Sequence, residues 1–101
     1  GTRLSAQEAQ DVGLVHRAVE PGNALQESLE LAQQLAAGAI ETMGLAKQAI
    51  AAAELPLEEG LAVERQAFVK AVSSPEAREG VGAFMQKRKP NFLQVNPTVS
   101  K

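Results

Sequence analysis

Three basic residues in succession, Lys87, Arg88 and Lys89, follow Phe84 in the last amphipathic stretch of the sequence. If Phe84 and Lys87 lie on one helix, their spacing of three places the ring and the ammonium group side by side at its C-terminal end. Such an end suits an anion or a carbonyl-rich surface. From the residues alone a simpler interpretation is favoured, in which Phe84 belongs to the core and Lys87 complements the helix dipole.

The remaining polar residues do not form a catalytic or metal-binding set. His16 is the only histidine, and no acid or serine lies at a spacing that suggests a proton relay. Glu58 and Glu59 are adjacent, but their position at a helix start is explained by the positive end of the dipole. The absence of cysteine excludes disulfides, a thiolate nucleophile and a zinc–thiolate site. We therefore expect no catalytic residue and no metal site in these 101 residues.

The composition indicates a small cytoplasmic helical protein. Apolar residues make up 45% of the chain, but many are alanine, and the three aromatic residues are all phenylalanine, so helices must pack closely through small side chains. The net charge of −2 argues against general binding to nucleic acid or to a membrane surface. No apolar run approaches the roughly 20 residues that span a bilayer.

Hydrophobic spacing and breakers predict five helices and one short strand. Ser5 and Glu8 form a capping box at the first helix, Asn23 can cap the second, and Ser73 or Ser74 precedes Pro75 at the fifth. The expected helices cover residues 6–12, 23–38, 39–53, 57–72 and 75–89, the strand covers 14–19, and an extended or disordered tail covers 93–101.

Several features of these elements call for a partner surface. A lone strand cannot satisfy its backbone groups without a neighbour. Gly80 and Gly82 fall inside the fifth helix, where they cost stability and therefore indicate close approach of another backbone or a ligand. Lys47 and Glu64 project from apolar stripes of successive helices, so we expect them to pair, with a snorkelling Lys47 as the alternative.

Five short motifs follow one another along the chain: RLSAQEA at residues 3–9, GLV at 13–15, AK at 46–47, LEEGLAVE at 57–64 and EGVGAFMQKRKPNF at 79–92. In order and spacing they resemble the C-terminal part of the enoyl-CoA hydratase/isomerase (crotonase) family. The resemblance covers residues 1–92, and residues 93–101 match no pattern of that family.

The resemblance implies the fold and one ligand contact. It implies an all-α region of four to five helices with at most one short strand, which supports a homotrimer or hexamer in the family. The family's oxyanion hole and catalytic glutamates lie upstream of Gly1, so none transfers to this chain. By the same resemblance Phe84 would lie against the adenine of CoA bound to a neighbouring subunit and Lys87 would pair with the ribose 3′-phosphate. Arg88 and Lys89 are weaker candidates.

Two functional hypotheses follow. The first is the C-terminal part of an enoyl-CoA hydratase or isomerase, with an acyl-CoA thioester as substrate and no further cofactor. The second is a non-catalytic helical module for oligomerisation or interaction. Hydratase, isomerase and other crotonase reactions differ in the upstream active site, so these residues do not separate them.

Overall fold

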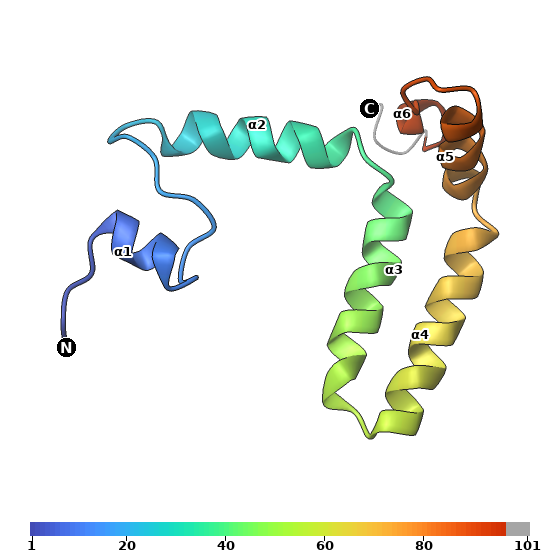
Figure 1. Ribbon diagram of the computed structural model, residues 1–101, viewed down its shortest axis with the longest axis horizontal. Helices are drawn as coiled ribbons and strands as arrows, with labels where there is room; N and C mark the ends of the chain where they lie inside the picture. Colours follow the sequence, from blue (N-terminus) through green and yellow to red (C-terminus); the bar gives the residue numbers. More distant parts are fainter. Residues whose placement is uncertain (97–101) are drawn as a thin grey trace. The chain divides into compact units, whose positions relative to one another are not determined.

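The computed structural model describes residues 1–96, which divide into two compact units, one of residues 1–33 and one that begins at residue 34. The all-α class is confirmed, since no strand forms within the described residues, and α6 comes in addition to the five predicted helices. The helices, shown in Figure 1, are α1 (Ala6–Asp11), α2 (Ala24–Ala36), α3 (Ile40–Ala51), the 3₁₀ helix η1 (Ala52–Glu54), α4 (Leu57–Val72), α5 (Pro75–Met85) and α6 (Phe92–Val95).

The first helix starts where its sequence predicts and ends one residue before the predicted Val12. The Ser5 hydroxyl accepts a hydrogen bond from the Glu8 backbone N–H at 3.2 Å, and the Glu8 carboxylate accepts one from the Ser5 N–H at 2.8 Å. Gly13 follows the helix at a φ of 75°, the left-handed conformation that glycine adopts at least cost. The capping box and the glycine stop are thus confirmed.

The predicted strand at residues 14–19 is wrong. These residues form bends and irregular backbone, because the described chain offers no neighbouring strand to take their hydrogen bonds. Side chains supply partners instead: the Ala18 N–H donates to the Gln10 amide oxygen at 2.5 Å. Arg17 and Glu27 form an exposed ion pair at 2.7 Å.

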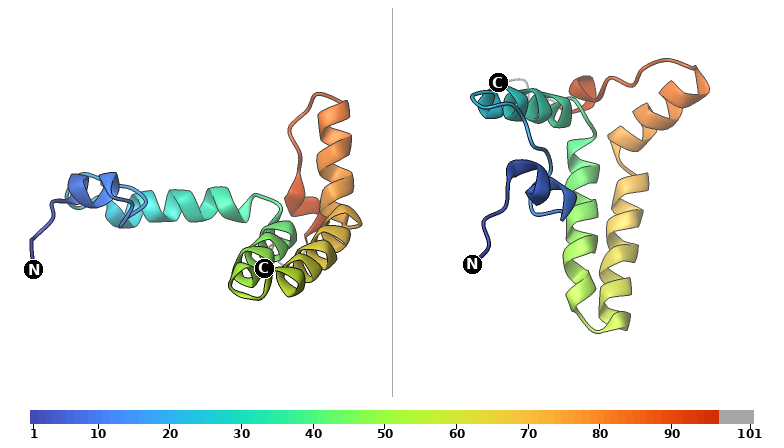
Figure 2. Two further views of the ribbon diagram at one scale, coloured as in Figure 1. Left: turned by 60° about the horizontal axis from the view of Figure 1, so that its bottom comes forward. Right: turned by 60° about the vertical axis from the view of Figure 1, so that its left-hand side comes forward.

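Helices α3 and α4 form an antiparallel hairpin through η1, and the views in Figures 1 and 2 agree that they lie side by side. Small residues make this close approach possible. Ala52 and Ala67 are buried, and a Cβ added at Gly60 would lie 2.8 Å from the Ala52 carbonyl oxygen. Glycine is therefore required where α4 leaves the turn.

Lys47 and Glu64 do not form the predicted pair. Ion pairs within residues 1–96 join Arg17 to Glu27 and Arg88 to Glu79. Both Lys47 and Glu64 are exposed, so neither charge needs a partner to offset desolvation.

Helix α5 begins as predicted but ends early. Ser74 accepts a hydrogen bond from the Ala77 N–H at 3.0 Å, and Pro75 occupies the first helical position. The helix ends at Met85, before the predicted end at residue 89, because the backbone turns left-handed at Lys87, with a φ of 53°.

The residues after α5 correct the predicted tail. Phe92–Val95 form helix α6, and Asn96 is buried, so the expected extended tail is wrong at its start. The Phe92 ring lies 3.8 Å from where a Cβ at Gly80 would stand, which is an ordinary van der Waals distance, so the described chain does not require glycine there. Nothing in the described chain approaches Gly82. The part of the tail prediction that concerns residues 97–101 lies outside the described residues.

The apolar side chains of the described residues mostly face outward. The buried apolar residues are alanines, namely Ala9, Ala52, Ala67 and Ala83, while large side chains such as Phe68, Val81 and Phe84 are exposed. Val81 and Phe84 therefore do not lie on the inner face of α5, which is built from Glu76, Gly80 and Ala83.

Candidate functional site

The candidate site lies where α5 ends and the chain turns toward α6. The Lys87 N–H donates to the Phe84 carbonyl at 3.1 Å, and the Arg88 N–H donates to the Ala83 carbonyl at 3.0 Å. These two bonds are the Schellman pattern, in which the residue beyond the helix cap takes the left-handed conformation. Lysine occupies this position here, although glycine would adopt it without steric cost.

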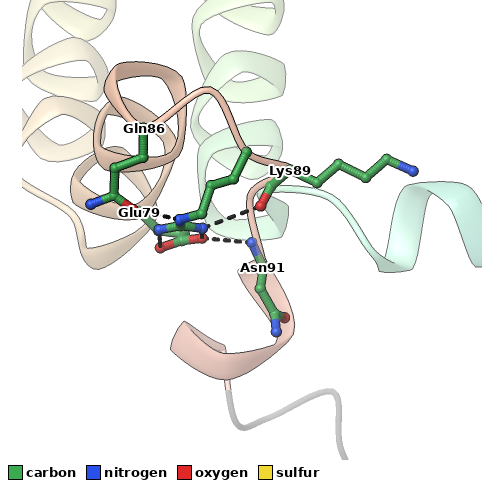
Figure 3. Close-up of polar contacts among 5 residues, drawn as sticks. Glu79, Gln86, Lys89 and Asn91 are labelled. Carbon is green, nitrogen blue, oxygen red and sulfur yellow. Dashed lines mark hydrogen bonds and ion pairs between the residues drawn. The ribbon is translucent and has the colours of Figure 1, made fainter.

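Glu79 holds the returning loop from the side of α5, as Figure 3 shows. The Arg88 guanidinium binds the Glu79 carboxylate in a bidentate manner, with Nη1 donating to Oε1 at 2.6 Å and Nη2 donating to Oε2 at 2.9 Å. The Asn91 backbone N–H donates to the same Oε1 at 2.6 Å. The Arg88 guanidinium also donates to the Gln86 amide oxygen at 2.7 Å and to the Lys89 carbonyl at 3.2 Å. One carboxylate thus joins α5 to both halves of the loop.

The residues predicted to contact CoA, namely Phe84, Lys87, Arg88 and Lys89, differ in exposure and in whether their side chains already have a partner in the protein. Phe84 is 82% exposed, so it is not part of a core formed by residues 1–96. Lys87 is exposed and makes no ion pair within those residues, whereas Arg88 is committed to Glu79. Lys89 contributes its carbonyl oxygen, and its ammonium group points away from the cluster (Figure 3). Because Lys87 lies beyond Met85, the helical spacing that paired it with Phe84 does not apply.

A second glutamate, Glu76, was not recognised from the sequence as a tertiary contact. Its side chain is only 1% exposed and accepts from the backbone N–H groups of Glu41 at 3.0 Å and Thr42 at 2.8 Å. The Thr42 hydroxyl donates to it at 2.6 Å, and the Asn96 amide donates as well. Glu76 therefore caps α3, whose own N-cap residue, Ala39, provides no side-chain hydrogen bond.

Both glutamates are held as carboxylates. Burial raises the pKa of Glu76, but the hydrogen bonds from Thr42, Asn96 and Glu41 outweigh it and leave the pKa below the ordinary 4.5. The Arg88 hydrogen bonds, with the Asn91 N–H, lower the pKa of Glu79 to about 2. A general acid needs a pKa near the working pH, so neither group is suited to proton transfer. Glu76 and Glu79 instead have structural roles, in which Glu76 caps α3 and Glu79 binds Arg88 and the Asn91 N–H.

An open apolar groove of about 590 Å³ runs between α3 and α4. Its walls are mostly aliphatic side chains, with Phe68 from α4 and the carboxylate of Glu64 at the same surface. The described residues contain no cluster of histidine and acidic side chains that could hold a metal ion. No helix among them is long and apolar enough to cross a membrane.

Comparison with known proteins identifies the class to which this fold and loop belong. The family model for enoyl-CoA hydratase/isomerase matches residues 1–95. The chain therefore belongs to the enoyl-CoA hydratase/isomerase family.

Particular relatives give the same assignment. A probable enoyl-CoA hydratase of Rhizobium meliloti (strain 1021) is 38% identical over 93 residues, which cover 91% of this chain and 36% of that protein. The 2,3-dehydroadipyl-CoA hydratase of Escherichia coli (strain K12) matches with the same identity and coverage. The crystal structure of an enoyl-CoA hydratase from Polaromonas sp. JS666 has a TM-score of 0.80 at 39% identity, covering 90% of this chain and 36% of that one. The chain thus spans just over a third of the length of these proteins.

Proposed function

We propose that this chain is the C-terminal helical part of an enoyl-CoA hydratase or isomerase acting on acyl-CoA thioesters. The observation that carries the proposal is the family match over residues 1–95, with relatives whose names specify hydratases. In this role the chain contributes a helical surface and a contact to CoA, while the reacting atoms are handled by residues upstream of Gly1.

The polar groups of the described chain support the proposal that the catalytic groups lie in another part of the enzyme. Hydration of an enoyl thioester requires positioned acid and base groups and donors that converge on the developing oxyanion. Glu76 and Glu79 both have lowered pKa values, and their oxygens are occupied by protein donors. Neither can supply that chemistry.

Two assays test whether the catalytic groups lie outside this chain. We expect the longer enzyme that contains this chain to hydrate crotonyl-CoA, and the isolated 101-residue protein to show no turnover above background. The measurement is the loss of enoyl thioester absorbance with rigorously purified protein. Turnover by the isolated chain would contradict the proposal, and so would a longer enzyme inert toward every enoyl-CoA tested.

The proposed CoA contact is made by Phe84 and Lys87. Phe84 presents an exposed ring for the adenine, and Lys87 presents an ammonium group for the ribose 3′-phosphate. The left-handed backbone at Lys87 costs about 1 kcal/mol relative to glycine, so a lysine at this position favours a role for its charge. An exposed ammonium–phosphate contact contributes only about 1 kcal/mol and weakens with salt.

The exposed apolar faces support assembly of the parent enzyme into a trimer or hexamer. Val81, Phe84 and Met85 are exposed on α5, and Leu61 and Phe68 are exposed beside the α3–α4 groove. Exposed apolar clusters of this kind mark interaction surfaces. They equally fit the alternative, a non-catalytic helical module, which the turnover assay separates from the enzyme.

A further inference from the structure

The loop between α5 and α6 contacts Glu79 at two points, Arg88 and Asn91, which are three residues apart. The backbone bonds of Lys87 and Arg88 fix only the first turn after α5. Beyond this turn, Arg88 and the Asn91 N–H both donate to Glu79 and so tie the chain to α5, ahead of the further contacts that Phe92 and Asn96 make with this helix. Without this carboxylate, residues 88–91 lose their polar anchor on α5.

Glu79 also decides which cation is available to a ligand. Both terminal nitrogens of Arg88 donate to the Glu79 carboxylate, and its Nε donates to the Gln86 amide oxygen. The Arg88 charge is therefore paired with that of Glu79, and these donors are occupied. The adjacent Lys87 makes no ion pair with a described residue. The three consecutive basic residues therefore differ in role: the Arg88 side chain binds Glu79, whereas Lys87 forms no ion pair with a described residue.

We propose that Glu79 and Arg88 are positioning residues for CoA recognition: by anchoring residues 88–91 on α5 they support the turn that carries Lys87, and by pairing with each other they leave Lys87 as the cation at the end of α5. Arg88 acts inside the protein and does not bind the phosphate. This inference rests on the proposed contact of Phe84 and Lys87 with the adenosine end of CoA. It adds that the contact requires a preformed loop, since an ordered cation loses less conformational freedom on binding.

The test uses the longer enzyme and two substrates, crotonyl-CoA and crotonyl-pantetheine, which lacks the adenosine, its 3′-phosphate and the diphosphate that joins them to pantetheine. The quantity measured is the ratio of kcat/KM for crotonyl-CoA to kcat/KM for crotonyl-pantetheine, at low salt. A general loss of folding or of active-site geometry lowers both values and leaves the ratio unchanged. A defect in presenting Lys87 lowers the ratio.

We expect Glu79→Gln to lower this ratio about threefold and Lys87→Ala to lower it about fivefold, since tenfold corresponds to 1.4 kcal/mol and the contact is exposed. Arg88→Lys keeps the charge but loses the fork, and should lower the ratio in the same direction. Glu27→Gln is the matched control, because it removes an exposed ion pair of similar length and should leave the ratio at the wild-type value.

The outcomes separate the inference from the function on which it rests. If Lys87→Ala lowers the ratio while Glu79→Gln and Arg88→Lys do not, the positioning role is overturned and the CoA contact stands. If Lys87→Ala leaves the ratio unchanged, the proposed contact itself fails, and the inference fails with it. If Glu79→Gln yields no folded enzyme, Arg88→Lys decides by the same ratio.

Discussion

At the scale of single residues, Glu76 and Glu79 show that two carboxylates one helical turn apart can have separate structural roles. Both lie in the first half of α5, where an acidic residue also complements the helix dipole. Glu76 reaches α3 and Asn96, whereas Glu79 reaches Arg88 and Asn91. The two therefore tie α5 to different segments of the chain.

Removal of Glu76 should destabilise the chain strongly. Glu76→Ala leaves the N–H groups of Glu41 and Thr42 without their acceptor in a buried site, which should lower the free energy of unfolding by about 2–3 kcal/mol. Urea denaturation of the 101-residue chain measures this, with Glu20→Ala, an exposed glutamate, as the control. Equal midpoints for the two variants would show that Glu76 does not support α3.

The lowered pKa values also predict a pH dependence with a defined sign. A carboxylate whose folded pKa lies below its unfolded value binds more protons when unfolded, so its stabilisation is present above pH 4.5 and lost as the pH falls. For Glu79 the window runs from 4.5 to about 2, and Glu76 and Glu8 act in the same direction. We expect the melting temperature to fall across this range.

The double variant Glu76→Gln, Glu79→Gln tests this assignment, because it removes two of the groups that titrate. Its melting temperature should change less between pH 5 and pH 2 than that of the wild type, as followed by circular dichroism. An unchanged pH dependence would assign the effect to other groups.

At the scale of elements, the close turn between α3 and α4 should tolerate no side chain at Gly60. Gly60→Ala places a methyl group 2.8 Å from the Ala52 carbonyl oxygen, and the strain should exceed the gain in helix propensity, with a net loss of about 1–2 kcal/mol. Gly44→Ala in α3 is the matched control. Nothing lies within 4 Å of its added Cβ, so it should stabilise the chain by about 0.5–1 kcal/mol. Loss of stability in the control, or gain at Gly60, would contradict the packing of the hairpin.

The helices that the sequence predicts well are those whose signals are local. Ser5 with Glu8, and Ser74 with Pro75, place the starts of α1 and α5 because each cap is made within a few residues. Pro56 likewise places the start of α4, which covers Leu57–Val72 as predicted. Such contacts can be identified from spacing alone.

The features that were missed depend on partners far along the chain. Glu76 meets Thr42 across 34 residues, and Arg88 meets Glu79 across nine, with a left-handed turn between them. No helical spacing connects such pairs, so the early end of α5 and the helix α6 could not be derived. The strand at residues 14–19 failed for a related reason, since β-branched composition does not provide a neighbouring strand.

At the scale of the whole molecule, the described residues have caps and polar networks but no large apolar core. The buried apolar side chains are alanines, while larger apolar side chains on α3, α4 and α5 remain exposed. Family membership explains this pattern if the exposed faces pack against the rest of a hydratase or against another subunit. The chain would then provide a preformed surface and loop, and the remainder of the enzyme would provide the chemistry.

The most direct test of this account compares CoA with dephospho-CoA, which lacks only the ribose 3′-phosphate. The dissociation constant of each is measured by calorimetry at low salt for the longer enzyme and for its Lys87→Ala variant. We expect the wild type to bind CoA about fivefold more tightly than dephospho-CoA, as an exposed charge pair of about 1 kcal/mol requires, and the preference to shrink as salt is added. Lys87→Ala should bind the two equally. A fivefold preference that persists in Lys87→Ala would contradict the assignment of the phosphate contact to this loop.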